Sequence, residues 1–62
     1  MKFRKFDVVE LNNNNKATIL ERKNHEYLAE IVDTNGRTVE KRNINQEDIK
    51  QVIYTRHKKL RL

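Results

Sequence analysis

Residues 27–41 read YLAEIVDTNGRTVEK, and this stretch decides the fold. Tyr27, Ala29 and Ile31 alternate with the residues between them, a period-2 pattern rich in β-forming side chains. The chain has a single glycine, Gly36, and the Asn35-Gly36 pair tolerates positive φ at both central positions of a type I′ turn. The stretch therefore predicts a β-hairpin with a type I′ turn.

Two further strands are predicted before this hairpin. Residues 6–11 read FDVVEL and carry apolar side chains on both faces, which favours a strand in a curled sheet or barrel. Residues 17–20, ATIL, are a short second strand. The four consecutive asparagines at 12–15 readily adopt the left-handed conformation, so a loop is expected there.

A helical turn is predicted after the hairpin. Asn45 is a favoured N-cap residue, and the acidic run at 46–48 suits the positive end of a helical turn. Ile44 and Ile49 occupy the positions at which a hydrophobic staple forms.

Two continuations of this turn are open. Residues 51–55, QVIYT, are rich in β-formers and favour a single turn followed by a last strand. The alternative is a helix over about 46–60, because five apolar or histidine side chains recur at helical spacing: Ile49, Val52, Ile53, His57 and Leu60.

The favoured fold class is all-β, a small five-stranded SH3-like (Src-homology-3-like) barrel with one helical turn before the last strand. Many short strands in 62 residues satisfy their edges by curling up. The alternative is an α+β fold, a four-stranded meander with a C-terminal helix. In the barrel the first and last strands pair, which gathers the two chain ends on one side.

Over residues 6–53 the chain resembles small bacterial and phage-associated SH3-like proteins, mostly of unknown function. The matching positions are 6–11, 17–20, 27–33, 36–38, Ile44 and Asp48-Ile49. Residues 12–16 depart from the pattern, because relatives usually carry glycines in this loop, and the departure weakens a link to KOW-type barrels. The resemblance implies a fold and a binding role, and it transfers no catalytic residue.

Length and composition favour one small cytoplasmic domain spanning 1–62. A chain of this size buries only about 60% of its unfolded surface, which leaves little room for a deep cleft. There is no cysteine, no apolar run of about 20 residues and no hydrophobic signal core at the N-terminus. We expect no membrane association, and a monomer or weak homodimer.

The net charge of +5 is concentrated at the two ends of the chain. Lys2, Arg4 and Lys5 lie within the first five residues, and the last seven, a basic tail at 56–62, contain four more basic groups: Arg56, Lys58, Lys59 and Arg61. Residues 6–55 contain the remaining seven basic groups and all nine acidic groups, so this central part of the chain is mildly acidic.

We expect no enzymatic activity, no cofactor and no metal. Serine and cysteine, the commonest nucleophiles, are both absent. His25 and His57 have no ligand spacing around them, and Asp33 is explained by turn chemistry.

The leading function hypothesis is therefore nucleic-acid binding through the basic ends, with aromatic rings as stacking platforms. Phe3 and Tyr27 are additional aromatic candidates. The predicted site comprises Lys2, Arg4, Lys5, Tyr54, Arg56, Lys58, Lys59 and Arg61. The alternative is a protein-interaction module that docks on a larger partner, since small barrels present exposed edges to peptide strands.

Overall fold

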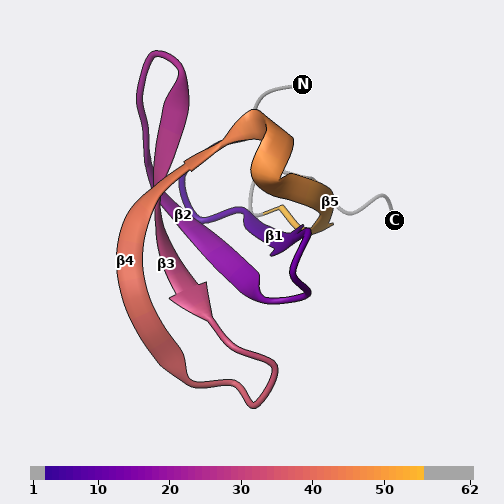
Figure 1. The fold of residues 1–62 in the computed structure, drawn as a ribbon. Helices are drawn as coiled ribbons and strands as arrows, with labels where there is room; N and C mark the ends of the chain where they lie inside the picture. Colours follow the sequence, from indigo (N-terminus) through magenta and orange to yellow (C-terminus); the bar gives the residue numbers. More distant parts are fainter. Residues whose placement is uncertain (1–2, 56–62) are drawn as a thin grey trace, which may run out of the picture.

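The computed structural model describes residues 3–55, which form five strands and one short 3-10 turn (Figure 1). The elements are β1 (Val8–Leu11), β2 (Lys16–Arg22), β3 (Glu26–Val32), β4 (Thr38–Asn45), the 3-10 turn η1 (Gln46–Asp48) and β5 (Ile49–Tyr54). Within this part of the chain no helix has the length and apolar character needed to cross a membrane.

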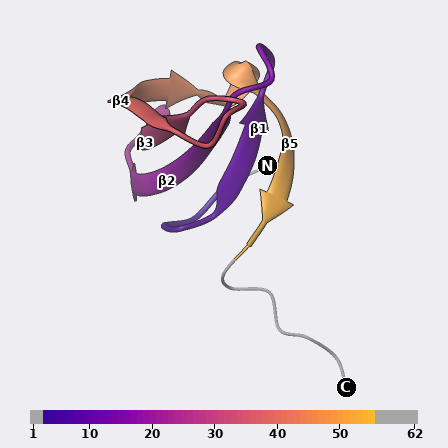
Figure 2. The ribbon, with the colours of Figure 1, turned by 90° about the horizontal axis from the view of Figure 1, so that it is seen from below.

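All strands join one antiparallel sheet in the order β4-β3-β2-β1-β5. Figure 2 shows the sheet bent into a barrel-like shape, with β5 alongside β1 and β4 on the far side. The predicted all-β fold, with one helical turn before the last strand, is confirmed. The alternative helix is wrong for residues 46–55, because 46–54 form η1 and β5 and Thr55 is not helical, and the rest of its span lies outside the described residues.

The core lies on one face of this sheet. Alternate residues of β1, β2 and β3 are buried, as the period-2 pattern predicts. The buried apolar residues are Phe3, Val9, Leu11, Ala17, Ile19, Tyr27, Ala29, Ile31 and Ile44. Burial of a valine, leucine or isoleucine side chain stabilises the fold by about 1.5–3 kcal/mol. Because the core is small, each of these side chains contributes a large fraction of the free energy of unfolding.

The pairing of β1 with β5 closes one side of the fold, as predicted. Val8 pairs with Tyr54 and Val9 with Val52, so one extra residue, Ile53, bulges from β5. A second irregularity follows between Glu10 and Leu11. Bulges bend a strand and increase its twist, which lets β5 wrap round the core.

The turn between β3 and β4 differs from the predicted type I′ turn. Gly36 has φ 86°, but Asn35 does not have positive φ. Asp33 determines this geometry: its Oδ1 accepts hydrogen bonds from the backbone N–H groups of Asn35 (2.9 Å) and Arg37 (3.0 Å). The Asp33 side chain thus favours a loop longer than the two-residue type I′ turn, and within this loop only Gly36 is left-handed.

The asparagine loop and η1 support each other. Asn14 has φ 75°, the left-handed conformation expected for this loop. Asn12 donates from its side chain to the carbonyl of Glu47 (2.9 Å) and from its backbone N–H to that of Asp48 (3.0 Å). Asp48 in turn accepts a hydrogen bond from the backbone N–H of Asn45 (2.9 Å). The predicted helical turn is confirmed, and the carbonyl groups of its last two residues accept hydrogen bonds from the asparagine loop that follows β1.

Several predicted strand boundaries differ from the observed ones: β4 continues to Asn45, beyond the predicted hairpin at 27–41, and β5 begins at Ile49, directly after η1, rather than at Gln51. The first strand begins at Val8 rather than at residue 6, because Phe6 has φ 73° and lies in a turn. The second strand is predicted to end at Leu20, but β2 extends to Arg22. Glu21 and Arg22, although charged, still pair with residues of β3.

We predict that Gly36→Ala lowers the free energy of unfolding by about 1 kcal/mol, because a β-carbon is disfavoured at positive φ. Nothing lies within 4 Å of the position that this β-carbon would occupy, so the backbone conformation accounts for the whole cost. Gly36→Asn, whose side chain tolerates the left-handed region, should lose clearly less. Urea unfolding of the three proteins measures the difference, and equal losses in both variants would contradict the explanation.

Candidate functional site

A tight turn at residues 4–7 leads into β1. The backbone N–H of Asp7 donates to the carbonyl of Arg4 (3.0 Å), and the N–H of Arg4 donates to Oδ2 of Asp7 (2.9 Å). Two further backbone bonds fasten the turn to β2: Phe6 donates to the carbonyl of Ile19 (2.6 Å), and Ile19 donates to that of Asp7 (2.9 Å). We call residues 4–7 the N-terminal turn.

The carboxylate of Asp7 connects this turn to the end of β5. Its side chain is buried, with Asp7 only 4% exposed, and its Oδ1 accepts a hydrogen bond from the hydroxyl of Thr55 (2.8 Å). Thr55 is the last described residue, so the described chain ends beside the turn at which it begins. The predicted meeting of the two ends holds as far as this residue.

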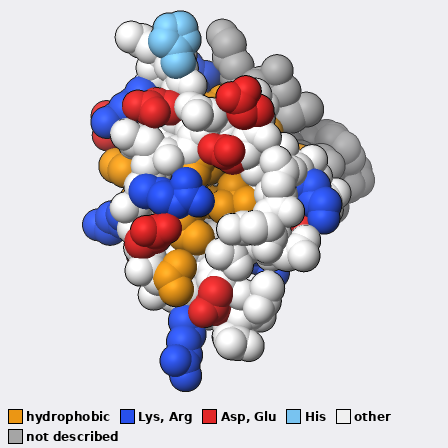
Figure 3. Space-filling model, viewed as in Figure 1, with side chains coloured by type: hydrophobic (Ala, Val, Ile, Leu, Met, Phe, Trp, Pro, Cys, Tyr) orange, Lys and Arg blue, Asp and Glu red, His pale blue; other side chains and the backbone are white. Residues whose placement is uncertain are grey.

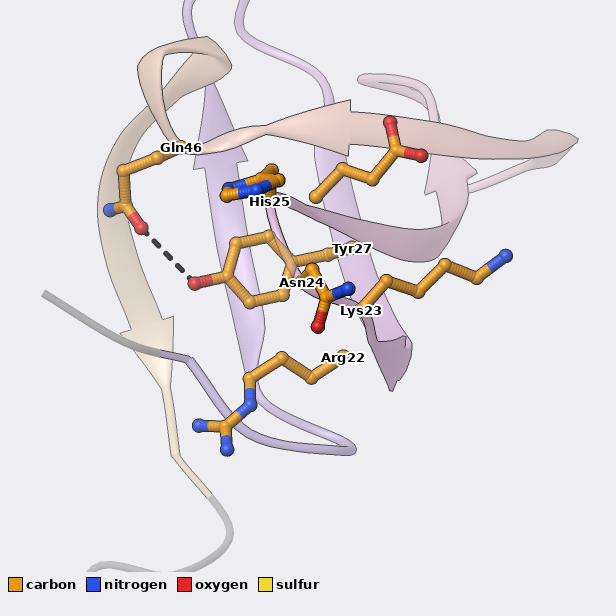
Figure 4. Close-up of a pocket in the computed structure, with 7 residues that line it drawn as sticks. Arg22, Lys23, Asn24, His25, Tyr27 and Gln46 are labelled. Atoms are coloured by element: carbon orange, nitrogen blue, oxygen red, sulfur yellow. Dashed lines mark hydrogen bonds between the residues drawn. The ribbon is translucent and has the colours of Figure 1, made fainter.

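Phe3 and Tyr27 form a second contact at the N-terminal side. Their rings pack edge to face, with centroids 5.7 Å apart. The Tyr27 hydroxyl accepts a hydrogen bond from the N–H of Phe3 (3.3 Å) and donates one to Oε1 of Gln46 (3.1 Å; Figure 4). Both aromatic residues are almost fully buried, so neither offers a ring face for stacking. Of the three aromatic candidates from the sequence, only Tyr54 is exposed, at 57%.

Exposed basic side chains gather next to the N-terminal turn. Arg4, Lys5 and Arg22 line a shallow open hollow of about 660 Å³, together with Leu20 and Glu21. We call the three cationic residues the basic surface. It joins two segments that are distant in sequence, because the turn hydrogen-bonds to β2 close to the point where that strand ends.

Arg22 also belongs to a neighbouring hollow of about 560 Å³ at the β2–β3 hairpin. Figure 4 shows its guanidinium on the same side as the Tyr27 hydroxyl and Gln46, below the tyrosine ring, with His25 above. Lys23 extends to the opposite side and so does not add to the basic surface. Arg22 therefore lines both hollows, one at the β2–β3 hairpin and one together with Arg4 and Lys5.

Other parts of the surface carry mixed charge. On the face seen in Figure 3, acidic and basic side chains alternate around a strip of hydrophobic ones. On β4, Arg42 pairs with Glu40 at 3.0 Å, and on β5 the ammonium of Lys50 lies 3.9 Å from the carboxylate of Glu10. These positive charges are partly neutralised. The hollow next to the basic surface, in contrast, is lined by three cationic residues and one acidic residue, Glu21.

Three of the eight residues predicted for the site lie in the described part of the chain. Arg4 and Lys5 lie together, and Tyr54 is exposed on β5, where it pairs with Val8. The other five lie outside the described residues: Lys2, Arg56, Lys58, Lys59 and Arg61.

Sequence reasoning missed one residue of the basic surface, Arg22, and the exposure of Phe6 beside Lys5. Arg22 lies in a mixed-charge stretch predicted as a connection, and only the pairing of β2 with the N-terminal turn brings it to Arg4 and Lys5. Phe6 is 44% exposed, and the ammonium of Lys5 lies 5.3 Å from its ring centroid. Its assignment to a strand hid this exposure.

The charged groups next to the N-terminal turn are mostly cationic, and the one buried carboxylate there is already hydrogen-bonded. Across residues 3–55, no group of three or more histidine, cysteine, aspartate or glutamate side chains could hold a metal ion. The buried carboxylate of Asp7 is engaged by structural donors at both oxygens. The basic surface itself offers cationic groups and the neighbouring Phe6 ring, which suit an anionic ligand with flat apolar parts.

Comparison with known proteins finds no match among family models, curated proteins or solved structures. The resemblance to small SH3-like proteins therefore stays a prediction, and the functional argument rests on the residues described above.

We predict that Asp7→Ala lowers the free energy of unfolding by about 1–3 kcal/mol, because two donors lose a buried acceptor. Thr55→Val removes one of the two hydrogen bonds and keeps the side-chain size, so its loss should be nearer 1 kcal/mol. Urea unfolding of both variants measures the two values. A loss from Thr55→Val equal to that from Asp7→Ala would show that the bond to the N-terminal turn contributes nothing.

Proposed function

We propose that this protein binds nucleic acid through the basic surface, with the phosphate backbone as the main contact. The observation that carries the proposal is the convergence of Arg4, Lys5 and Arg22 around one open hollow. Clustered, exposed cations neutralise phosphates and release their counterions, which supplies most of the affinity of non-specific nucleic-acid binding.

The net charge of the chain supports the same proposal. With a net charge of +5, the protein attracts a polyanion at long range. The clustered cations of the basic surface would orient the approaching polyanion toward that surface. The proposal includes five residues on sequence grounds, because they flank the described segment at both ends: Lys2, Arg56, Lys58, Lys59 and Arg61.

The absence of salt bridges at the basic surface also matters. Among the described residues, the ion pairs are those of Arg42 and Lys50, so Arg4, Lys5 and Arg22 hold no carboxylate that a phosphate would have to displace. A ligand therefore gains their full charge, reduced only by screening and by the nearby Glu21.

The test is a pair of triple variants that remove the same charge from different parts of the surface. One carries Arg4→Gln, Lys5→Gln and Arg22→Gln. The matched control carries Lys16→Gln, Arg37→Gln and Lys41→Gln, three exposed residues that do not line the hollow of the basic surface. Lys16 begins β2, at the opposite end from Arg22, Arg37 lies in the β3–β4 turn, and Lys41 lies in the middle of β4. Titration with labelled DNA and RNA, single- and double-stranded, over a salt series gives the affinity and its salt dependence.

We expect the first triple variant to bind far more weakly than the control, with a shallower salt dependence. Each lost phosphate contact reduces the slope of log K against log salt by about 0.7–0.9. Equal affinity and equal slopes in the two triple variants would mean that binding follows net charge alone, and the basic surface would then not be the site.

A second candidate function is docking on a protein partner through the edge of β5. Three consecutive apolar residues of this edge strand are exposed: Val52 at 43%, Ile53 at 46% and Tyr54 at 57%. The opposite edge, β4, carries Glu40, Lys41 and Arg42, charges that discourage strand pairing. An extended segment, including β5 of a second copy, could add to the apolar edge.

The oligomeric state tests self-pairing at this edge. Sedimentation velocity over a concentration series should show a dimer in the parent protein, and the dimer should be lost with Ile53→Lys. A monomer at every concentration would rule out pairing between copies.

A further inference from the structure

We propose that Asn35 is a site of spontaneous deamidation, and that the turn built by Asp33 sets the rate of this reaction. The inference is independent of the proposed function, because it concerns a covalent change far along the sheet from the basic surface. The loop that holds Asn35 follows Val32, which pairs with Lys16 at the start of β2, whereas Arg22 ends that strand.

The reaction needs two neighbouring groups, which the Asn35-Gly36 pair supplies. The backbone nitrogen of Gly36 attacks Cγ, the side-chain amide carbon of Asn35, and closes a five-membered succinimide ring. The bond from Cγ to Nδ2 breaks, and Nδ2 leaves as ammonia with the proton of the Gly36 N–H. Water then opens the ring at one of its two carbonyl groups, which leaves aspartate or isoaspartate at position 35.

Gly36 makes its own backbone nitrogen accessible for the attack. It has no β-carbon beside this nitrogen, and glycine has more backbone freedom than any other residue. Outside the two neighbouring residues, no atom lies within 4 Å of the position that a β-carbon would occupy, so the surface around Gly36 is open. Every other asparagine of the chain is followed by a residue with a side chain.

The side-chain amide of Asn35 is available for the same reaction. Asn35 is exposed, and within residues 3–55 only its backbone N–H takes part in a hydrogen bond. By contrast, the side chains of Asn12, Asn14 and Asn43 form hydrogen bonds to other segments of the sheet. The most reactive pair in the sequence is therefore also one of the least restrained in its side chain.

The backbone of the turn, however, opposes the reaction. The N–H of Gly36 donates to the carbonyl of Asp33 (3.0 Å), so the attacking nitrogen is engaged. Oδ1 of Asp33 accepts from the N–H groups of Asn35 (2.9 Å) and Arg37 (3.0 Å), which fixes the backbone on both sides of Gly36. The Gly36 N–H must give up its bond and its proton before the nitrogen attacks, so the turn has to open first. Openings of an exposed loop cost less free energy than global unfolding.

Deamidation changes the charge and the geometry of this turn. Each product carries a carboxylate, which lowers the net charge of +5 by one. Isoaspartate also routes the main chain through its side-chain carbon, which adds one methylene between positions 35 and 36. The N–H groups at 35 and 37 then no longer have the spacing that lets both of them reach Oδ1 of Asp33.

The test follows deamidation of the parent protein and three variants in mildly alkaline buffer: Gly36→Ala, Asp33→Ala and Asp33→Asn. Samples taken over time are digested with trypsin, and mass spectrometry measures the conversion of amide to acid. The parent is also incubated in urea, which gives the rate in the unfolded chain.

An internal control lies in the same tryptic peptide. No lysine or arginine stands between Lys23 and Arg37, so trypsin releases residues 24–37 together. This peptide contains Asn24 as well as Asn35, and fragmentation assigns the acid to one position or the other. Asn24 is also exposed, but a histidine follows it in place of a glycine.

We expect Asn35 of the parent to react about 10-fold faster than Asn24, and Gly36→Ala to remove most of this difference, because its β-carbon hinders the attack. Asp33→Ala should accelerate the reaction at Asn35 about 5- to 100-fold and leave Asn24 unchanged, because two of the hydrogen bonds that hold the turn are absent. Asp33→Asn keeps a side-chain oxygen as acceptor and should react at close to the rate of the parent.

Two results would overturn the inference. If Asn35 reacts no faster than Asn24 in the parent, position 35 is not a deamidation site. If Asn35 reacts as fast in the folded parent as in urea, or if Asp33→Ala accelerates both asparagines equally, the Asp33 turn does not set the rate. No nucleic acid enters these measurements, so neither result bears on the proposed function.

Discussion

The antiparallel pairing of β1 with β5 is the contact on which the rest of this structure depends. β1 is a strand of four residues between β2 and β5, and its inward side chains Val9 and Leu11 are buried. Without β5, β1 would be an edge strand with unpaired backbone groups on one side. The pairing also brings Thr55 to the buried carboxylate of Asp7, which holds the N-terminal turn.

The candidate site follows from that arrangement. Because Asp7 fixes the turn and Phe6 pairs with Ile19, Arg4 and Lys5 are held near the end of β2, where Arg22 lies. No single segment contains the basic surface. It forms where the start of the chain meets a strand end, so charge that is scattered along the sequence becomes local in space.

Much of the fold could be predicted because the deciding signals are local. The alternation at Tyr27, Ala29 and Ile31 fixed the buried face of β3, and Asn45 with its acidic neighbours marked η1. The predictions that failed depend on contacts across the sheet. Phe6 has a left-handed backbone conformation because tertiary hydrogen bonds hold its turn. The intrinsic preference of phenylalanine is for an extended strand, so local sequence predicts the wrong conformation.

The site was predictable only in part, for the same reason. Arg4 and Lys5 stand out as a cluster in the sequence, whereas Arg22 joins them through the β1–β2 register. Exposure is equally non-local: Phe3 and Phe6 have similar sequence surroundings, yet one packs against Tyr27 and the other projects from the turn. A residue pattern does not distinguish them until the strands are paired.

The bond between Asp7 and Thr55 has a kinetic consequence, because it joins residues 48 positions apart. The two hairpins made by β2, β3 and β4 close short loops, whereas the β1–β5 contact must close almost the whole described chain. Non-local contacts of this kind are formed slowly, since the loop entropy is lost before the contact is gained. We therefore expect the N-terminal turn to become ordered late in folding, after most of the sheet, so that the proposed binding surface would form only when folding is complete.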